Sequence, residues 1–123
     1  MNNGEPDVIV DFVFEKGLFF IAIENIGEAP AYRVSVTFSH DIRGVGGSKG
    51  ISDMPLFRRI EFMPPRKKIT TFLDTSASYF KREQPLNIDT IVTFTNRKRK
   101  RFRHTIKHNL EIYRDIGYIR HYP

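Results

Sequence analysis

The strongest constraint on the fold is a strict alternation of apolar and polar residues across positions 31–40. The apolar members of this pattern, which alternate with arginine, serine and threonine, are Tyr32, Val34, Val36 and Phe38. An apolar run at 18–23 precedes it, and a turn containing Gly27 and Pro30 joins the two. A period of two buries one side of a strand and leaves the other in water. We therefore predict an antiparallel pair of strands, with Tyr32 on the buried side of the second.

Several other segments have strand character. From residue type and alternation, we predict strands at 8–14, 18–24, 57–62, 68–73, 87–95 and 100–110. The glycine-rich stretch 44–50 predicts an exposed, flexible connector, and residues 76–84 predict a loop or a single helical turn. About seven short strands separated by turns predict an all-β fold, namely an immunoglobulin-like antiparallel β-sandwich.

The segment 100–110 also fits a helix, because Phe102, Ile106 and Leu110 recur at helical spacing and Tyr113 continues the series. Read as a strand, it places Phe102, His104 and Ile106 on one side. We interpret it as a strand, because a strand and a turn precede it and together predict a hairpin.

Composition bounds the domain count and the chemistry. A chain of 123 residues with 40% apolar side chains can build one core, and the absence of cysteine excludes disulfides and thiolate sites. We predict a flexible N-terminus at 1–6, a sandwich at 7–110, and a C-terminal extension at 111–123 that packs on the sandwich or on a partner.

No segment has the character of a signal peptide or a membrane span. We therefore expect no membrane insertion by this segment and, if the chain is complete, a cytoplasmic location.

One stretch resembles a known family. Asn25-Ile26-Gly27, followed by Ala31-Tyr32-Arg33-Val34, resembles the turn and strand of prokaryotic immunoglobulin-like modules of the cell-adhesion-related (CARDB-like) type. Pro64-Pro65 lies where such modules often carry a Pro-Gly turn, although the glycine is missing here. The resemblance covers most of residues 7–110 and implies a non-catalytic domain, often part of a surface or membrane-associated protein. The basic character of the last hairpin is not part of that common pattern.

Positive charge is concentrated late in the chain. Residues 97–123 carry 9 basic and 2 acidic side chains, a net charge of +7, whereas residues 1–60 carry 6 and 8, a net charge of −2. The net charge of the whole chain is +6. A local excess of this kind is typical of a surface that attracts polyanions or acidic proteins.

The candidate binding residues lie in the segment 97–107, here named the basic hairpin. They are Arg97, Arg99, Lys100, Arg101, Arg103 and Lys107. If the whole segment is extended, the arginines form a row with positions about 6.6 Å apart, which suits the phosphates of an extended polyanion. The alternative is a solvated edge strand, whose positive charges prevent sheet-to-sheet aggregation. Acidic side chains of this chain, such as Asp11, Glu15 or Glu24, would then neutralise these charges. No aromatic residue other than Phe102 is interleaved, and Phe102 is predicted to face inward, which argues against base stacking.

Other polar and aromatic residues give weaker signals. His104 and His108 would lie about 13 Å apart on a strand, too far to share a metal. Tyr113, Tyr118 and Tyr122 are candidates for docking to a partner, or for packing on the sandwich. No arrangement of residues predicts a catalytic or metal site, or a cofactor. We therefore expect a non-enzymatic interaction module that binds a protein partner or a second subunit through a sheet edge and loops, the alternative being binding of nucleic acid or another polyanion by the basic hairpin.

Overall fold

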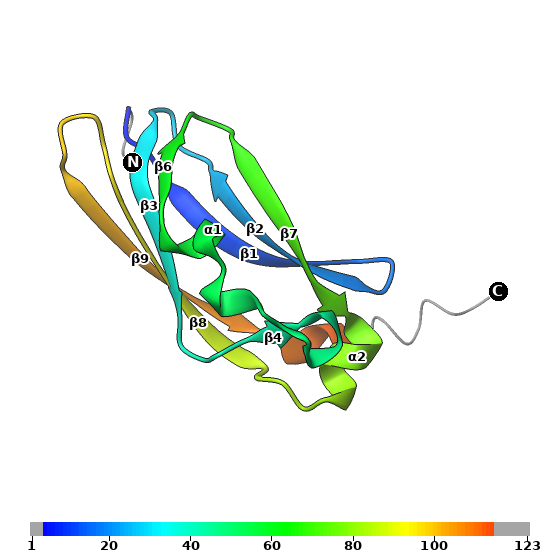
Figure 1. Ribbon diagram of the computed structural model, residues 1–123. Coiled ribbons are helices and arrows are strands. Elements are labelled where there is room, and N and C mark those ends of the chain that lie inside the picture. The colour runs from blue at the N-terminus through cyan, green and yellow to red at the C-terminus, as the bar shows by residue number, and fades with distance from the viewer. Residues whose placement is uncertain (1–3, 115–123) are drawn as a thin grey trace.

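Two antiparallel sheets pack together in a sandwich-like arrangement in the computed structural model, which describes residues 4–114 (Figure 1). The three-stranded sheet has the order β1 (Val8–Glu15), β2 (Leu18–Asn25) and β7 (Lys68–Thr75). The four-stranded sheet has the order β6 (Ile60–Met63), β3 (Ala31–Phe38), β8 (Asn87–Thr95) and β9 (Arg101–Asn109). A strand forms in each predicted segment, although the one predicted at 57–62 has different bounds, and β8 and β9 form the predicted hairpin.

Short elements fill the connections between the large strands. Between β3 and β6 lie β4 (Arg43–Gly44), η1 (Val45–Gly47), β5 (Lys49–Gly50), η2 (Ile51–Asp53) and α1 (Pro55–Arg58). Helix α2 (Ser76–Lys81) follows β7, and the turn η3 (Leu110–Tyr113) follows β9. None of the helices in this part of the chain is long and apolar enough to cross a membrane.

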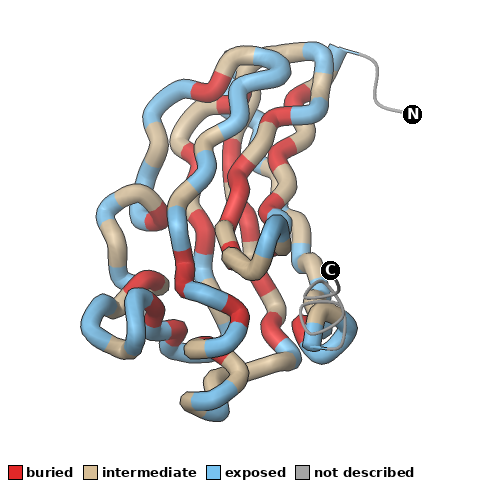
Figure 2. The backbone as a smooth tube through the Cα atoms, turned by 90° about the vertical axis from the view of Figure 1, so that its right-hand side faces the viewer, coloured by how far each residue is buried: buried red, intermediate tan, exposed pale blue. Residues whose placement is uncertain are grey.

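The core lies between the two sheets, where buried residues from both inner faces meet (Figure 2). Strand β2 lies between β1 and β7 and contributes Phe19, Ile21 and Ile23, all with no exposed surface. Strand β8 contributes Ile88, Val92 and Phe94 from the opposite layer. Alternation along these strands therefore sets which side chains form the core, as the sequence pattern predicts.

The glycine-rich stretch 44–50 is largely exposed, as predicted, but it is not a free connector. Gly44 is buried, and a Cβ built on it would lie 2.0 Å from the carbonyl oxygen of Leu73. Gly46 donates a backbone hydrogen bond of 3.2 Å to Asp74 Oδ1. Contacts with β7 thus fix this stretch in place. The predicted strand at 57–62 also begins too early, because Pro55 starts the turn α1 and pairing begins at Ile60.

A β-bulge in β3 corrects the predicted orientation of Tyr32. Arg33 has a left-handed φ of 52°, and the pairing of β3 with β8 shifts register between Tyr32 and Ser35. Ala31 and Val34 are both fully buried, so Tyr32 and Arg33 between them lie on the outer face of the sheet. The prediction that Tyr32 faces the core is therefore wrong, because one extra residue interrupts the period of two.

Candidate polyanion-binding surface

The basic hairpin consists of a tight turn followed by a strand. Asn96 Oδ1 accepts hydrogen bonds of 2.9 Å from the backbone N–H groups of Lys98 and Lys100, which closes the turn. Strand pairing resumes at Arg101, opposite Thr95. Arg97 and Arg99 therefore lie at the tip of the hairpin and do not continue the row that the extended interpretation expects.

Three of the predicted cations share the outer face of β9. Arg101, Arg103 and Lys107 are exposed, and they alternate with half-buried residues that point to the core side. Lys107 pairs with Asp89 directly across the sheet, with an Nζ to Oδ2 distance of 3.3 Å. The part of this row that stays free for another anion is therefore Arg101 and Arg103.

Few carboxylates neutralise the basic hairpin. Lys100 Nζ lies 3.1 Å from Glu5 Oε2, and its ammonium group also lies 5.2 Å from the centre of the Phe102 ring. Within residues 4–114, no carboxylate forms an ion pair with Arg97, Lys98, Arg99, Arg101 or Arg103. Asp11, Glu15 and Glu24, the acids considered from sequence, pair with none of them. Unneutralised like charges held this close destabilise the fold, so an anionic ligand would relieve repulsion here.

An open pocket of about 400 Å³ lies beside the hairpin on the outer face of the four-stranded sheet. Five polar residues line it, together with Phe94 and Phe102: Arg33 of β3, Thr93 and Thr95 of β8, and Arg101 and Arg103 of β9. Arg33 Nη2 donates a hydrogen bond of 2.7 Å to Thr95 Oγ1, which fixes its position. We call these five residues the arginine pocket. Guanidinium and hydroxyl donors gathered in this way suit the oxygens of a phosphate group.

Sequence reasoning missed Arg33 as a member of this site. Arg33 precedes Arg101 by 68 positions, and only the adjacency of β3, β8 and β9 brings the two together. Arg33 alternates with apolar residues in the sequence, and this pattern does not indicate that Arg101 is its neighbour.

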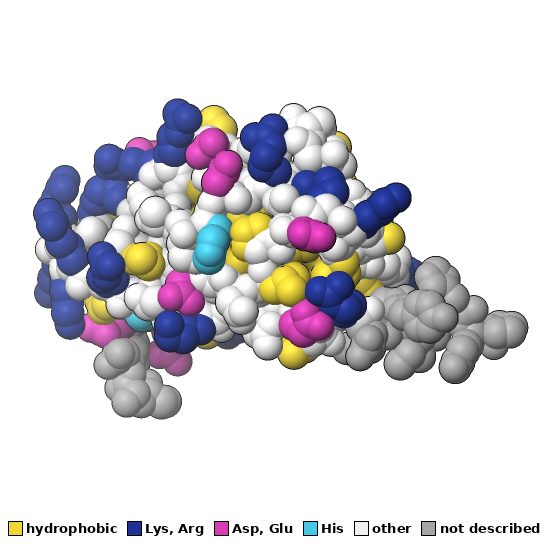
Figure 3. Space-filling view, turned by 90° about the horizontal axis from the view of Figure 1, so that it is seen from below, with side chains coloured by type: hydrophobic (Ala, Val, Ile, Leu, Met, Phe, Trp, Pro, Cys, Tyr) yellow, Lys and Arg dark blue, Asp and Glu magenta, His cyan; other side chains and the backbone are white. Residues whose placement is uncertain are grey.

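Figure 3 shows lysine and arginine side chains gathered at the left-hand end of the molecule. Figure 1 places the tip of the β8–β9 hairpin on the same side.

The two histidines of β9 lie on its core side and do not meet. His104 Nδ1 lies 3.3 Å from the carbonyl oxygen of Val8, whereas His108 Nε2 lies 3.1 Å from Thr90 Oγ1. Burial lowers the pKa of His108, and the nearby carboxylates of Asp11 and Asp89 act in the opposite direction. Among the described residues, no three His, Asp or Glu side chains are grouped so that they could hold a metal ion.

Tyr113 packs on the sandwich, which is the first of the two alternatives for the C-terminal extension. Its ring stacks on Phe14 with centroids 5.8 Å apart, and its hydroxyl donates a hydrogen bond of 3.4 Å to the carbonyl of Phe12. Burial raises the pKa of this hydroxyl. Tyr118 and Tyr122 lie outside the described residues, so docking by these two remains a prediction.

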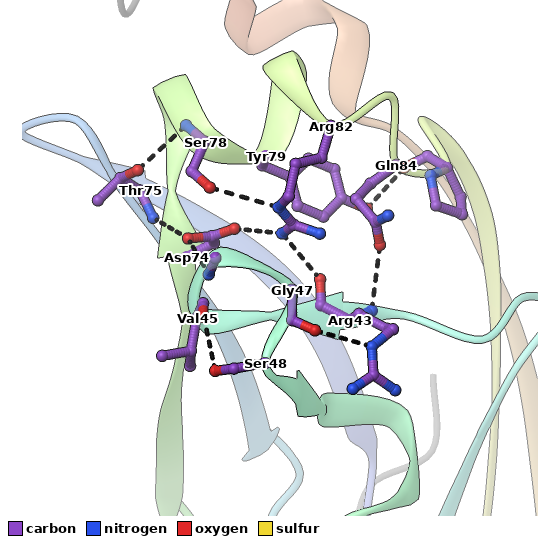
Figure 4. Close-up of polar contacts among 12 residues, drawn as sticks. Arg43, Val45, Gly47, Ser48, Asp74, Thr75, Ser78, Tyr79, Arg82 and Gln84 are labelled. Atoms are coloured by element: carbon purple, nitrogen blue, oxygen red, sulfur yellow. Dashed lines mark hydrogen bonds and ion pairs between the residues drawn. The ribbon is translucent and has the colours of Figure 1, made fainter.

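A second polar cluster, around Asp74 and Arg82 (Figure 4), lies beside α2, at the end of the molecule away from the tip of the β8–β9 hairpin (Figure 1). Asp74 is almost fully buried, forms an ion pair with Arg82, and accepts hydrogen bonds from the backbone N–H groups of Gly46 and Thr75. Arg82 Nη2 also donates to the carbonyl of Arg43 at 3.2 Å. The hydrogen bonds of Asp74 and Arg82 connect β4, η1, β7 and α2. We interpret the cluster as structural.

Comparison with known proteins identifies the family. Residues 1–114 match the family described as a domain of unknown function, DUF8453. The chain belongs to the DUF8453 family. No curated protein and no solved structure shows significant similarity to it. The DUF8453 match includes β3, β8 and β9, so the arginine pocket and the basic hairpin lie within the domain itself.

Proposed function

We propose that this DUF8453 domain is a non-catalytic binding module whose ligand is a phosphate-bearing polyanion. The binding surface consists of the arginine pocket together with the cations of the hairpin tip, Arg97, Lys98 and Arg99. The observation that carries the proposal is the convergence of Arg33, Arg101 and Arg103 on one open pocket, with no ion-pairing carboxylate within residues 4–114. Bidentate contacts to phosphate are what such an arrangement of guanidinium groups favours.

The proposal includes an immunoglobulin-like arrangement of the strands. The order β1-β2-β7 in one sheet and β6-β3-β8-β9 in the other supports it, because the chain crosses between the layers after β2, after β6 and after β7, as it does in such sandwiches. The turn at Asn25 and Gly27 supports the relationship to CARDB-like modules at the level of the fold. A Cβ on Gly27 would lie 2.5 Å from the backbone N of Asp7, so the close packing of this turn requires glycine.

A protein partner is the second candidate, favoured by the open outer edge of β9. This strand is nine residues long and lies at the border of its sheet, where an extended segment of another chain can pair with it. The exposed large hydrophobic side chains give weaker support for a protein partner than the β9 edge does, because they are spread over separate elements. They are Ile26, Val45, Phe62, Phe72 and Ile112. Association of the purified chain with itself is tested by light scattering over a range of concentrations.

The salt dependence of binding tests the polyanion proposal. The probes are inorganic polyphosphate and a labelled single-stranded oligothymidylate, titrated in parallel. If Arg97, Arg99, Arg101 and Arg103 each contact one phosphate of the single strand, log affinity falls against log salt with a slope of about −3, roughly −0.7 per contact. The double variant Arg99→Ala/Arg101→Ala is expected to weaken binding and to reduce the magnitude of the slope by about 1.4.

A matched control removes the same charge elsewhere. Lys49 of β5 and Lys81 of α2 are both exposed and lie outside the proposed binding surface. Lys49→Ala/Lys81→Ala is therefore expected to bind nearly as well as the unchanged chain. Equal weakening in both double variants would mean that net charge alone drives association. No binding of either probe at low salt would overturn the proposed function.

A further inference from the structure

Beside the arginine pocket, a half-buried aromatic ring and an exposed one form a pair on the outer face of the sheet. Tyr32 of β3 and Phe62 of β6 are direct neighbours across the sheet, with ring centroids 5.4 Å apart and planes inclined by 52°. Phe62 is 49% exposed, an unusual state for a phenylalanine in a paired strand. Their position on the outer face follows from the bulge at Arg33, which turns Tyr32 away from the core.

The aromatic pair and the arginine pocket form one continuous row across the four strands. Phe62 pairs with Tyr32, Tyr32 pairs with Thr95, and Thr95 pairs with Arg101. With neighbouring strands about 4.8 Å apart, Tyr32 lies roughly 10 Å from the β9 end of this row. A short stretch of an extended single strand covers such a span.

Arg33 connects the two halves of the row. Its guanidinium carbon lies 5.7 Å from the centre of the Tyr32 ring, and its Nη2 donates to Thr95 in the arginine pocket. An apolar ring surface therefore lies next to a cluster of phosphate-binding donors, on a rigid paired sheet. Phe102, the aromatic residue within the basic hairpin, lies on the core side of β9, whereas Tyr32 and Phe62 lie on the outer face.

We infer that the phosphate-bearing polyanion is single-stranded nucleic acid, with a base stacked on Tyr32 and Phe62 and the neighbouring phosphates held in the arginine pocket. The inference rests on the proposed function and adds the ligand class to it. Aromatic platforms beside a basic groove bind single strands without strong sequence preference, because every base has a flat π face. A duplex hides those faces between its own base pairs, so it can use the arginines but not the aromatic pair.

The deciding experiment compares three probes of equal length by fluorescence anisotropy at low salt. They are a single-stranded oligothymidylate of about 12 nucleotides, the same strand made entirely of abasic sites, and inorganic polyphosphate. The unchanged chain is expected to bind oligothymidylate about tenfold more tightly than the abasic strand. Equal affinity for the two strands would overturn the inference while leaving the proposed function intact.

Leucine substitutions separate stacking from charge. Phe62→Leu and Tyr32→Leu are each expected to weaken oligothymidylate binding about tenfold and to leave polyphosphate binding unchanged. Phe72→Leu is the matched control, because Phe72 is 38% exposed and pairs with Phe20 on the outer face of the other sheet. Should Tyr32→Leu fail to fold, the more exposed Phe62 still gives the test. Equal weakening by Phe62→Leu and Phe72→Leu would contradict the inference.

A spectroscopic reporter gives a direct readout of stacking. The chain has no tryptophan, so Phe62→Trp introduces a single indole at the aromatic pair. We expect oligothymidylate to change its fluorescence strongly and polyphosphate to leave it nearly unchanged. A polyglutamate peptide that bound as tightly as oligothymidylate and altered the indole signal equally would overturn the inference in favour of an acidic protein ligand.

Discussion

Asn25 Nδ2 donates a hydrogen bond of 2.9 Å to the carbonyl oxygen of Met63, so a side chain of the three-stranded sheet holds the last residue of β6 in the other sheet. The same amide nitrogen donates to the carbonyl of Ala29, and Oδ1 accepts from the backbone N–H groups of Asp7 and Gly27. This buried amide therefore joins three chain segments at the end of the molecule nearest the basic hairpin.

Asn25→Ala is expected to lower the free energy of unfolding by roughly 3 kcal/mol, because it leaves buried backbone groups without partners. Denaturant titration measures the effect. Asn96→Ala is the control: Asn96 also accepts two backbone hydrogen bonds, but in an exposed turn. We expect a loss below about 1 kcal/mol there. Similar losses for the two variants would show that burial adds nothing to the role of Asn25.

Gly44→Ala is expected to destabilise the chain by more than 2 kcal/mol, on the order of other overpacked core sites. The added methyl group would overlap the Leu73 carbonyl, a backbone atom that cannot rotate away. Gly46→Ala, two residues along, meets nothing within 4 Å and is affected only through its φ of 67°. Its expected loss is about 1 kcal/mol. A thermal melt of each variant checks the order, and a reversed order would contradict the close approach at Gly44.

Asp74→Ala is expected to reduce stability by about 3 kcal/mol or more, because it leaves the Arg82 guanidinium half-buried without its carboxylate. Glu61→Ala, which breaks the exposed pair with Arg59, should change stability by less than about 0.5 kcal/mol. Equilibrium unfolding in urea measures both. If Asp74→Ala were as mild as Glu61→Ala, the cluster around Arg82 would not connect β7 to the loop at 44–50.

His108 makes stability depend on pH near neutrality. Since burial lowers its pKa from the ordinary value of 6.5, the unfolded chain binds a proton at a higher pH than the folded chain does. The contribution to stability is therefore present above pH 6.5 and is lost as pH falls toward the folded-state pKa. Compared with His108→Gln, the unchanged chain should lose more in melting temperature between about pH 8 and pH 5.5. The control His40→Gln, at an exposed site, should follow the unchanged chain, and identical profiles for all three would contradict this prediction.

Local sequence signals were sufficient to predict the strands but not the site. The alternation from Val34 onward in β3 and the turn at Asn96 depend on neighbouring residues, and both are confirmed. The bulge at Arg33 depends on how β3 pairs with β8, which a single strand cannot reveal. For the same reason, the loop at 44–50 was predicted to be flexible, although Gly46 in it is held by Asp74, 28 positions later in the chain. Long-range pairing decides both features, and with them the membership of the arginine pocket.

The bulge at Arg33 gives this sheet a property that regular strands lack. An uninterrupted strand offers a ligand only every second side chain, whereas here consecutive positions, an aromatic and a guanidinium, are presented together. Consecutive side chains that face the same ligand are usually found on loops, and a loop loses conformational freedom when it binds. Here the backbone is held by pairing on both sides of the bulge, at Tyr32 and at Val34, so a ligand at Tyr32 and Arg33 would meet a backbone that loses little further conformational freedom on binding.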